Sequence, residues 1–174
     1  ISIGPGSFTG LRIGLATAKM LSYALSIPVV AVSSLEAMAY HYPVPGVYVA
    51  SVLDAQKSNA YFALYEWNGK GFDEKKQTCV MDFEEVVKYC STLDKPVVFV
   101  GDIAQKKADI IAQYENVSLG LPHLCMPRAS NVAMAAKSRF ENEDYDNIMD
   151  LEPVYIRRSE AEVLWEKRHG EKLT

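Results

Sequence analysis

The sequence predicts a mixed α/β fold with an antiparallel portion. Segments with helical spacing of apolar residues alternate with short apolar runs, which is typical of helices and strands packed in layers. Three of the predicted strands follow one another directly, and Asn68 and Gly69 form a turn between two of them. These three strands therefore form an antiparallel meander and not an uninterrupted βαβ array.

The expected elements follow from local signals. Ahead of the meander we expect a helix at 8–25, a buried strand at 29–32 and a helix at 35–41 with Ser33 or Ser34 as its N-cap. The meander covers 47–54, 60–67 and 72–81. After it we expect a helix at 83–93 capped by Asp82, a strand at 96–100, a helix at 103–114, a strand at 117–121 and a helix at 132–141 capped by Ser130 or Asn131.

The helix at 8–25 has few polar positions. Leu11, Leu15 and Leu25 follow one stripe, while Ile13 and Met20 lie on the opposite side. A helix that is apolar nearly all round is expected to be buried on more than one side, either within the chain or against a partner helix. Its small residues, Gly10, Gly14 and Ala18, form a further stripe that would permit close approach of another helix.

Composition excludes several classes of protein. Apolar residues make up 49% and charged residues 23% of the chain, so it is neither disordered nor fibrous. The formal charge of -4 argues against a protein that holds nucleic acid by its own charge. Cys79, Cys90 and Cys125 are far apart and form no CxxC pair, which favours a reducing cytoplasm over a disulfide framework or a zinc site. No apolar run is long enough to predict a membrane span.

The start of the chain is unusual. It opens with apolar residues, Ile1-Ser2-Ile3, that resemble the end of a buried strand, and it has no initiator Met. We therefore expect an N-terminal piece of the fold to be missing from this chain.

A glycine-rich turn between that strand and the first helix is the strongest local motif. Its residues Gly4, Gly6, Ser7, Thr9 and Gly10 bring backbone N–H groups and the positive end of a helix dipole together, which suits an anion such as phosphate. The spacing matches neither a P-loop nor the dinucleotide fingerprint. A plain tight turn with a helix cap is the commoner role for such residues, and we favour it.

The sequence contains no evident catalytic group and no metal site. His41, His123 and His169 are isolated, and Ser7 has no evident base partner. Asp54 and Asp102 follow predicted strands and are the best carboxylates for an active crevice, although loop or cap roles are the simpler reading. We therefore assign no catalytic residue, no metal ligand and no cofactor.

The long motif from Gly4 to Gly14, continuing through Ala16-Thr17-Ala18-Lys19, resembles the signature of the TsaB (YeaZ) family. The strands around Asp54 and 61–65 are similar to that family's DAR…VY segment, and 153–157 is similar to its closing P-x-Y-x-R segment. There are two departures. The family's opening strand, with its AIDTS-like segment, is absent, and Gln56-Lys57 stands where the family has an Arg pair.

The resemblance implies a two-lobed actin/Hsp70/sugar-kinase-like fold that lacks its N-terminal strands. The remainder of the first lobe would span 1–45, the second lobe 46–155, and a helix or tail returning toward the first lobe 156–174. It also implies a cytoplasmic protein that serves the synthesis of threonylcarbamoyladenosine on tRNA without being an enzyme. In that family TsaB is the non-catalytic paralogue of TsaD, a metal-containing transferase, and the ATPase TsaE joins them.

The implied partners are therefore a TsaD-like transferase, a TsaE-like ATPase and a second copy of the chain, with tRNA reached only indirectly and no membrane involved. The first-lobe helix would carry the partner interface, formed by Leu11, Arg12, Gly14, Leu15, Ala18, Lys19 and Ser22. The older name of the family, glycoprotease, is not supported by this sequence, which has no evident set of peptidase catalytic residues. The alternative function is a nucleotide-dependent phosphotransferase or hydrolase of the same fold, in which the Gly4–Gly10 loop would bind phosphate.

Overall fold

A computed structural model describes residues 1–156 of the chain. Its first part contains β1 (Ser2–Gly4), α1 (Phe8–Leu25), β2 (Val32–Ser33) and α2 (Ser34–Ala39). The middle contains β3 (Tyr48–Asp54), β4 (Asn59–Trp67), β5 (Phe72–Asp82), α3 (Phe83–Ser91), β6 (Val97–Val100), α4 (Asp102–Lys106), α5 (Ala108–Ile111) and β7 (Val117–Leu119). A 3-10 helix, η1 (Pro122–Leu124), and α6 (Ala129–Glu141) follow.

A five-stranded sheet in the order β5-β4-β3-β6-β7 forms the centre of the molecule. Strands β3, β4 and β5 are antiparallel neighbours, as the meander predicts, and Asn68 closes the second turn by accepting backbone N–H groups from Lys70 and Gly71. Strands β6 and β7 run parallel to β3, because helical segments connect them to the sheet. The mixed α/β class predicted from the sequence is therefore confirmed.

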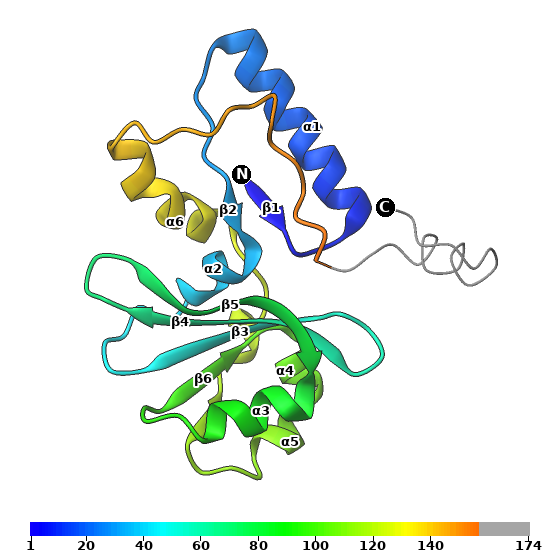
Figure 1. Ribbon diagram of the computed structural model, residues 1–174, viewed down its shortest axis with the longest axis vertical. Coiled ribbons are helices and arrows are strands. Elements are labelled where there is room, and N and C mark those ends of the chain that lie inside the picture. The colour runs from blue at the N-terminus through cyan, green and yellow to red at the C-terminus, as the bar shows by residue number, and fades with distance from the viewer. Residues whose placement is uncertain (157–174) are drawn as a thin grey trace, which may run out of the picture.

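Helices cover both faces of this sheet (Figure 1). On one face Leu35, Met38 and Ala39 of α2 pack on Val49 and Leu53 of β3. On the other face the side chains of α3, α4 and α5 bury a larger core that includes Phe62, Phe83 and Phe99. Because both faces of β3 are covered, the strand is apolar along almost its whole length, which is what its sequence predicts.

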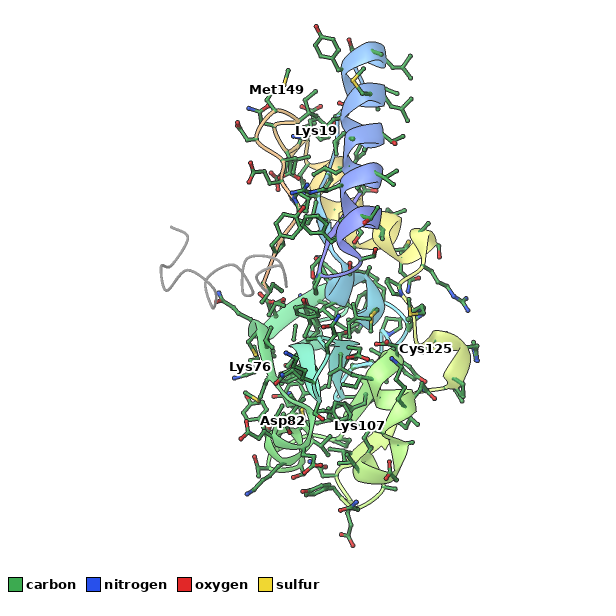
Figure 2. The ribbon with its side chains drawn as sticks, turned by 90° about the vertical axis from the view of Figure 1, so that its right-hand side faces the viewer. Lys19, Lys76, Asp82, Lys107, Cys125 and Met149 are labelled. Atoms are coloured by element: carbon green, nitrogen blue, oxygen red, sulfur yellow. The ribbon has the colours of Figure 1, made fainter. Side chains whose placement is uncertain are left out.

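Strands β1 and β2 and helix α1 form a separate layer beside the sheet face that α2 covers (Figure 1). Strands β1 and β2 form a parallel pair, and α1 contacts β1. The segment that follows α6 returns along this layer, where Asp146 accepts the Ala31 N–H and the Val154 N–H donates to the Ile3 carbonyl. Lys19 also donates to the Met149 carbonyl, so this segment lies beside α1 (Figure 2).

Helix α6 contacts α2 and β2. Residues 146–155 lie beside residues 29–31, β1 and α1, through hydrogen bonds such as Asp146 with Ala31, Val154 with Ile3 and Lys19 with Met149. The expected lobe boundaries at residues 45 and 155 stay a prediction. The charged tail predicted at 156–174 lies outside the described residues except for Ile156.

Several predicted bounds need correction. The strand expected at 29–32 is confined to β2, with Val29 in an isolated bridge to Asp146. The helix expected at 103–114 is two helices that break at Lys107, which lets Ile111 join the same core as Ile103. Neither Ser130 nor Asn131 caps α6, because the helix begins at Ala129 and the Asn131 amide instead hydrogen-bonds His41.

Within the chain, α1 is buried on one side only, and burial of its other side against a partner stays a prediction. Leu15 and Ser22 are buried on one side of the helix, while Ile13, Met20 and Leu21 on the other side are exposed. Among the described residues, no helix is long and apolar enough to cross a membrane.

Ser51 in the middle of β3 provides a test of the core. Its backbone pairs with Ala63 on β4 and with Val100 on β6. Its hydroxyl is buried and, among the described residues, is the buried side-chain oxygen or nitrogen without a hydrogen-bond partner. A buried unsatisfied polar group costs roughly 1–3 kcal/mol. Ser51→Ala should therefore leave the free energy of unfolding unchanged or raise it by up to about 1 kcal/mol in urea titrations.

The matched control is Ser34→Ala. The buried Ser34 hydroxyl is hydrogen-bonded to that of Ser2 at 2.7 Å, so its removal should cost about 1 kcal/mol. A greater loss from Ser51→Ala than from Ser34→Ala would contradict this account of the core.

Candidate functional site

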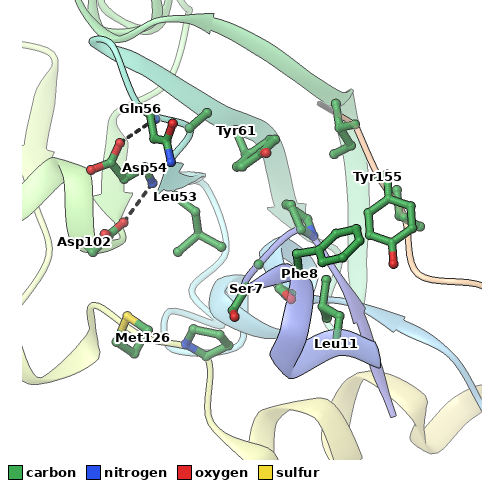
Figure 3. A pocket seen from close by; sticks show the side chains of 17 residues that line it. Ser7, Phe8, Leu11, Leu53, Asp54, Gln56, Tyr61, Asp102, Met126 and Tyr155 are labelled. Carbon is green, nitrogen blue, oxygen red and sulfur yellow. Dashed lines mark hydrogen bonds between the residues drawn. The ribbon is translucent and has the colours of Figure 1, made fainter. Parts of the chain in front are cut away.

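A cavity of about 630 Å³ lies where the first layer meets the end of the sheet (Figure 3). The N-terminal loop of α1, the ends of β3 and β4, the segment after η1 and residues 154–156 contribute to its walls. Its lining consists of Pro5, Gly6, Ser7, Phe8, Leu11, Ser34, Leu53, Asp54, Ala55, Gln56, Tyr61, Asp102, Met126, Pro127, Val154, Tyr155 and Ile156. Its volume is in the usual range for small-ligand sites.

The glycine-rich loop forms one wall, and its first glycine has a structural reason. Gly4 has a φ of 111°, and a Cβ there would lie 3.0 Å from Leu11 Cδ1 and 3.3 Å from the Val154 carbonyl oxygen. A side chain is therefore excluded by both the backbone conformation and the neighbouring return segment. The loop is shaped at this point to let residues 153–155 pass close to β1.

Ser7 is the N-cap of α1. Its Oγ accepts the Gly10 N–H at 3.3 Å, and its carbonyl accepts the Leu11 N–H. Of the predicted phosphate-loop residues, Gly6 and Ser7 line the cavity, whereas Gly4, Thr9 and Gly10 are not part of its lining. This geometry is that of a capped helix start, and phosphate binding stays a prediction.

Two carboxylates form the polar end of the cavity. Asp102, the first residue of α4, accepts the Asp54 N–H at 3.0 Å, and Asp54 accepts the Gln56 N–H at 2.7 Å (Figure 3). The Lys106 ammonium, one helical turn after Asp102, donates to Asp54 at 2.9 Å and to Asp102 at 3.1 Å. The sequence predicted both aspartates as crevice candidates, and the structure brings them together.

This bonding changes how Asp54 and Lys106 ionise. The hydrogen bond from Lys106, followed by the one from the Gln56 N–H, lowers the pKa of Asp54 below its ordinary value. The hydrogen bonds to Asp54 and Asp102 raise the pKa of Lys106. Both groups therefore stay charged at neutral pH, and the cation and the two carboxylates form one ion-pair cluster.

The part of the cavity wall formed by Met126 and Pro127 is held in place by residues that have no assigned role in the sequence predictions. The His41 Nε2 donates to the Met126 carbonyl at 2.9 Å, while its Nδ1 accepts from the Asn131 amide at 3.1 Å. The Tyr42 hydroxyl accepts the Leu121 N–H at 2.9 Å. These bonds hold Met126 and Pro127 at the cavity. No local sequence signal identifies them, because the partners lie about 80 residues apart.

Aromatic rings form the rim near α1. Phe8 and Tyr155 lie 5.1 Å apart between ring centroids, and both line the cavity. The Arg12 guanidinium lies 4.1 Å from the Phe8 centroid, and its Nε donates to the Tyr155 hydroxyl at 2.9 Å. Arg12, predicted as a partner residue, thus ties α1 to the return segment.

Most of the predicted interface set lies on the inner side of α1. Leu15 and Ser22 are buried by the chain itself and are not available to a partner in this structure. Leu11, Gly14, Ala18 and Lys19 are half-buried on the same side. The stripe of Gly10, Gly14 and Ala18 does not meet another helix, since the nearest atom to a Cβ at Gly14 would be Ile1 Cδ1 at 4.0 Å.

Among the described residues, no group of three or more His, Cys, Asp and Glu side chains could hold a metal ion.

Comparison with known proteins identifies the relatives of this chain. The family model described as "TsaD: tRNA N6-adenosine threonylcarbamoyltransferase" matches residues 1–165. The tRNA threonylcarbamoyladenosine biosynthesis protein TsaB of Bacillus subtilis is 32% identical over 95% of this chain and 71% of that protein. The chain belongs to the TsaB family. TsaB of Escherichia coli is 29% identical over 96% of this chain and 72% of its own length.

Solved structures support the family's fold. YeaZ from Pseudomonas aeruginosa aligns with a TM-score of 0.73 at 24% identity, covering 88% of this chain and 70% of that one. A second structure, described as an uncharacterised protein with similarity to peptidase YEAZ from the same organism, aligns with a TM-score of 0.74 at 24% identity over 90% of this chain and 71% of its own. These alignments confirm the predicted actin-like fold class. At this identity they show the fold alone.

The Asp54 cluster makes stability depend on pH in a defined direction. Because the folded pKa of Asp54 is lowered, its contribution is fully present above the unfolded value, about 3.9, and is lost as the pH falls through the folded value. Asp54→Asn should lower the free energy of unfolding at pH 7 by less than about 1 kcal/mol, since the pair is partly exposed. It should also reduce the loss of stability between about pH 5 and pH 2 in urea titrations.

Lys106→Met is the control, because it removes the partner that contributes most to the lowered pKa. It should flatten the acid dependence in the same direction, and the double variant should add little to either single change. An unchanged slope in both single variants would contradict this assignment.

Proposed function

We propose that this chain is an accessory, non-catalytic subunit in the synthesis of threonylcarbamoyladenosine on tRNA. Sequence similarity supports a role in this biosynthesis, since relatives of this chain are named as tRNA threonylcarbamoyladenosine biosynthesis proteins TsaB. The observation that carries the accessory role is the outer face of α1, which is apolar and not covered by the chain. Ile13, Met20 and Tyr23 there are 63%, 65% and 68% exposed.

The exposed apolar surface extends along the helix. Ala16 and Ala24 continue the same exposed side of the helix. The exposed side chains of Leu21, Leu25 and Ile27 extend the apolar surface at the C-terminal end of the helix. Contiguous apolar patches on monomers usually mark sites of interaction. The partner that the family suggests is a TsaD-like transferase, with a second copy of this chain taking its place when the transferase is absent.

This proposal moves the expected interface from the inner to the outer side of α1. Arg12 and Lys19 remain at its border, where they already hold the return segment. A TsaE-like ATPase would join the complex, and tRNA would be bound by the partners, in keeping with the net charge of -4.

The non-catalytic role is supported by the bonding of the candidate groups. Asp54 and Asp102 are both paired with Lys106, and the Ser7 hydroxyl caps α1. His41 is hydrogen-bonded to Met126 and Asn131, so it does not serve as a base for Ser7.

The alternative function is a nucleotide-dependent phosphotransferase or hydrolase. One observation favours it, namely that Gly6 and Ser7 face the same cavity as Asp54 and Asp102. Calorimetry of the chain with ATP and magnesium distinguishes the two functions. Sub-millimolar binding would favour the enzyme, and the accessory subunit is expected to give no signal.

Charge on the outer face of α1 should prevent complex formation. In the variant Ile13→Glu with Met20→Glu, the affinity for the TsaD-like protein of the same organism should fall at least about a hundredfold, because two buried apolar contacts are replaced by charges. Sedimentation velocity of the mixture measures this directly. Both side chains are exposed, so the variant should fold normally.

Met134→Glu is the matched control, since Met134 is an exposed apolar residue on α6. It should leave the complex intact. Unchanged sedimentation of the mixture containing the α1 variant would refute the proposed interface.

A further inference from the structure

The cavity has an amphiphilic character that the proposed function does not use. Phe8, Tyr61 and Tyr155 contribute aromatic rings to its walls, and Leu11, Leu53 and Val154 contribute aliphatic ones. Asp54 and Asp102 are the charged residues of its described lining (Figure 3). An occupant that matches this surface has an apolar body and a positive charge at one end.

The chain itself shows that these walls bind cations. At the polar end, the Lys106 ammonium lies between the two carboxylates although it does not line the cavity. At the aromatic rim, the Arg12 guanidinium lies over the Phe8 ring and 5.8 Å from the Tyr155 centroid. These are two different kinds of cation recognition, ion pairing and cation–π contact, at opposite parts of one cavity.

Both groups can accept a further cation. Phe8, Tyr61 and Tyr155 contribute ring surface to the cavity wall. Each oxygen of Asp54 and Asp102 accepts one hydrogen bond in the structure and has two lone pairs. The Lys106 ammonium is hydrogen-bonded to both carboxylates, and the charge of Lys107 also acts on Asp54. A guanidinium has a planar fork that suits both a carboxylate and an aromatic face.

We propose that the cavity binds an arginine side chain presented, next to an apolar residue, by a segment of a partner protein. The charge complementarity and the aromatic rim select this occupant over a phosphate-bearing ligand, which would face two carboxylates. The inference does not depend on the α1 interface or on the pathway, and the two can fail separately.

The full 174-residue chain can be titrated calorimetrically with the blocked dipeptide Ac-Leu-Arg-NH₂. The matched probe is Ac-Leu-citrulline-NH₂, which keeps the shape and lacks the charge. We expect saturable binding of the arginine probe and at least about tenfold weaker binding of the citrulline probe. Asp54→Asn should weaken binding of the arginine probe.

Lys106→Met provides the decisive test, because it should change the binding affinity in opposite directions for a cationic and an anionic ligand. Without the competing ammonium, the arginine probe should bind about threefold to tenfold more tightly, whereas a phosphate ligand would bind more weakly. Lys137→Met removes the same charge from α6, where Lys137 pairs with Glu141, and should leave the affinity unchanged. Thermal unfolding of each variant confirms that it is folded.

Any of four results with these probes would overturn the proposal, and agmatine provides a fifth test. The four results are equal binding of both dipeptides, no binding of the arginine probe at 10 mM (roughly −2.7 kcal/mol), weaker binding after Lys106→Met, and binding of Mg–ATP that the arginine probe displaces. Agmatine supplies the guanidinium without a peptide. If it binds as tightly as the dipeptide, the cavity recognises free cations and the assignment to a protein segment is wrong.

Discussion

Strand β3 is hydrogen-bonded along both edges, to β4 in antiparallel and to β6 in parallel register, and its side chains are buried on both faces. The rest of the structure is arranged around this double burial. Helix α2 must cover one face and helices α3 to α5 the other, because an apolar strand exposed on either side would be unstable in water. The exposed end of the strand is Asp54, where the strand leaves the core, and there the cavity begins.

The closeness of β6 to β3 also determines the polar end of that cavity. Gly101 follows β6 with a φ of 137°, and a Cβ on it would lie 1.6 Å from the Val52 carbonyl oxygen. Only glycine permits this approach. It places Asp102 so that its carboxylate reaches the Asp54 N–H and Lys106 reaches both carboxylates. The ion-pair cluster is thus a consequence of backbone packing.

Helix α1 has two sides with different roles. Its inner side is held by β1 and by the return segment, through contacts such as Arg12 with Tyr155 and Lys19 with Met149. The outer side remains apolar and exposed. The sequence showed a helix apolar nearly all round, but it did not show which side the chain itself would bury. The interface expected from the motif therefore contains Leu15 and Ser22, which are internal.

The sequence by itself determined the elements whose signals are local. The meander, the length of α1 and the cap at Asp82 follow from apolar periodicity, turn residues and short-range hydrogen bonds, and they agree with the structure. Of the two candidate caps for α2, Ser33 and Ser34, the structure uses Ser33. The motif at Gly4–Gly14 also sufficed to indicate the family. These features depend on residues a few positions apart, so one sequence contains all the information that they need.

Only the tertiary structure decided the features that depend on distant partners. Asn131 does not cap α6 because His41, 90 residues earlier in the chain, engages its amide. The break at Lys107 follows from the shared core of Ile103 and Ile111, and the cavity requires segments from both ends of the chain. Such contacts form because burial and hydrogen bonding in the folded state outweigh local preference, and no local pattern in a single sequence records which distant residues will meet.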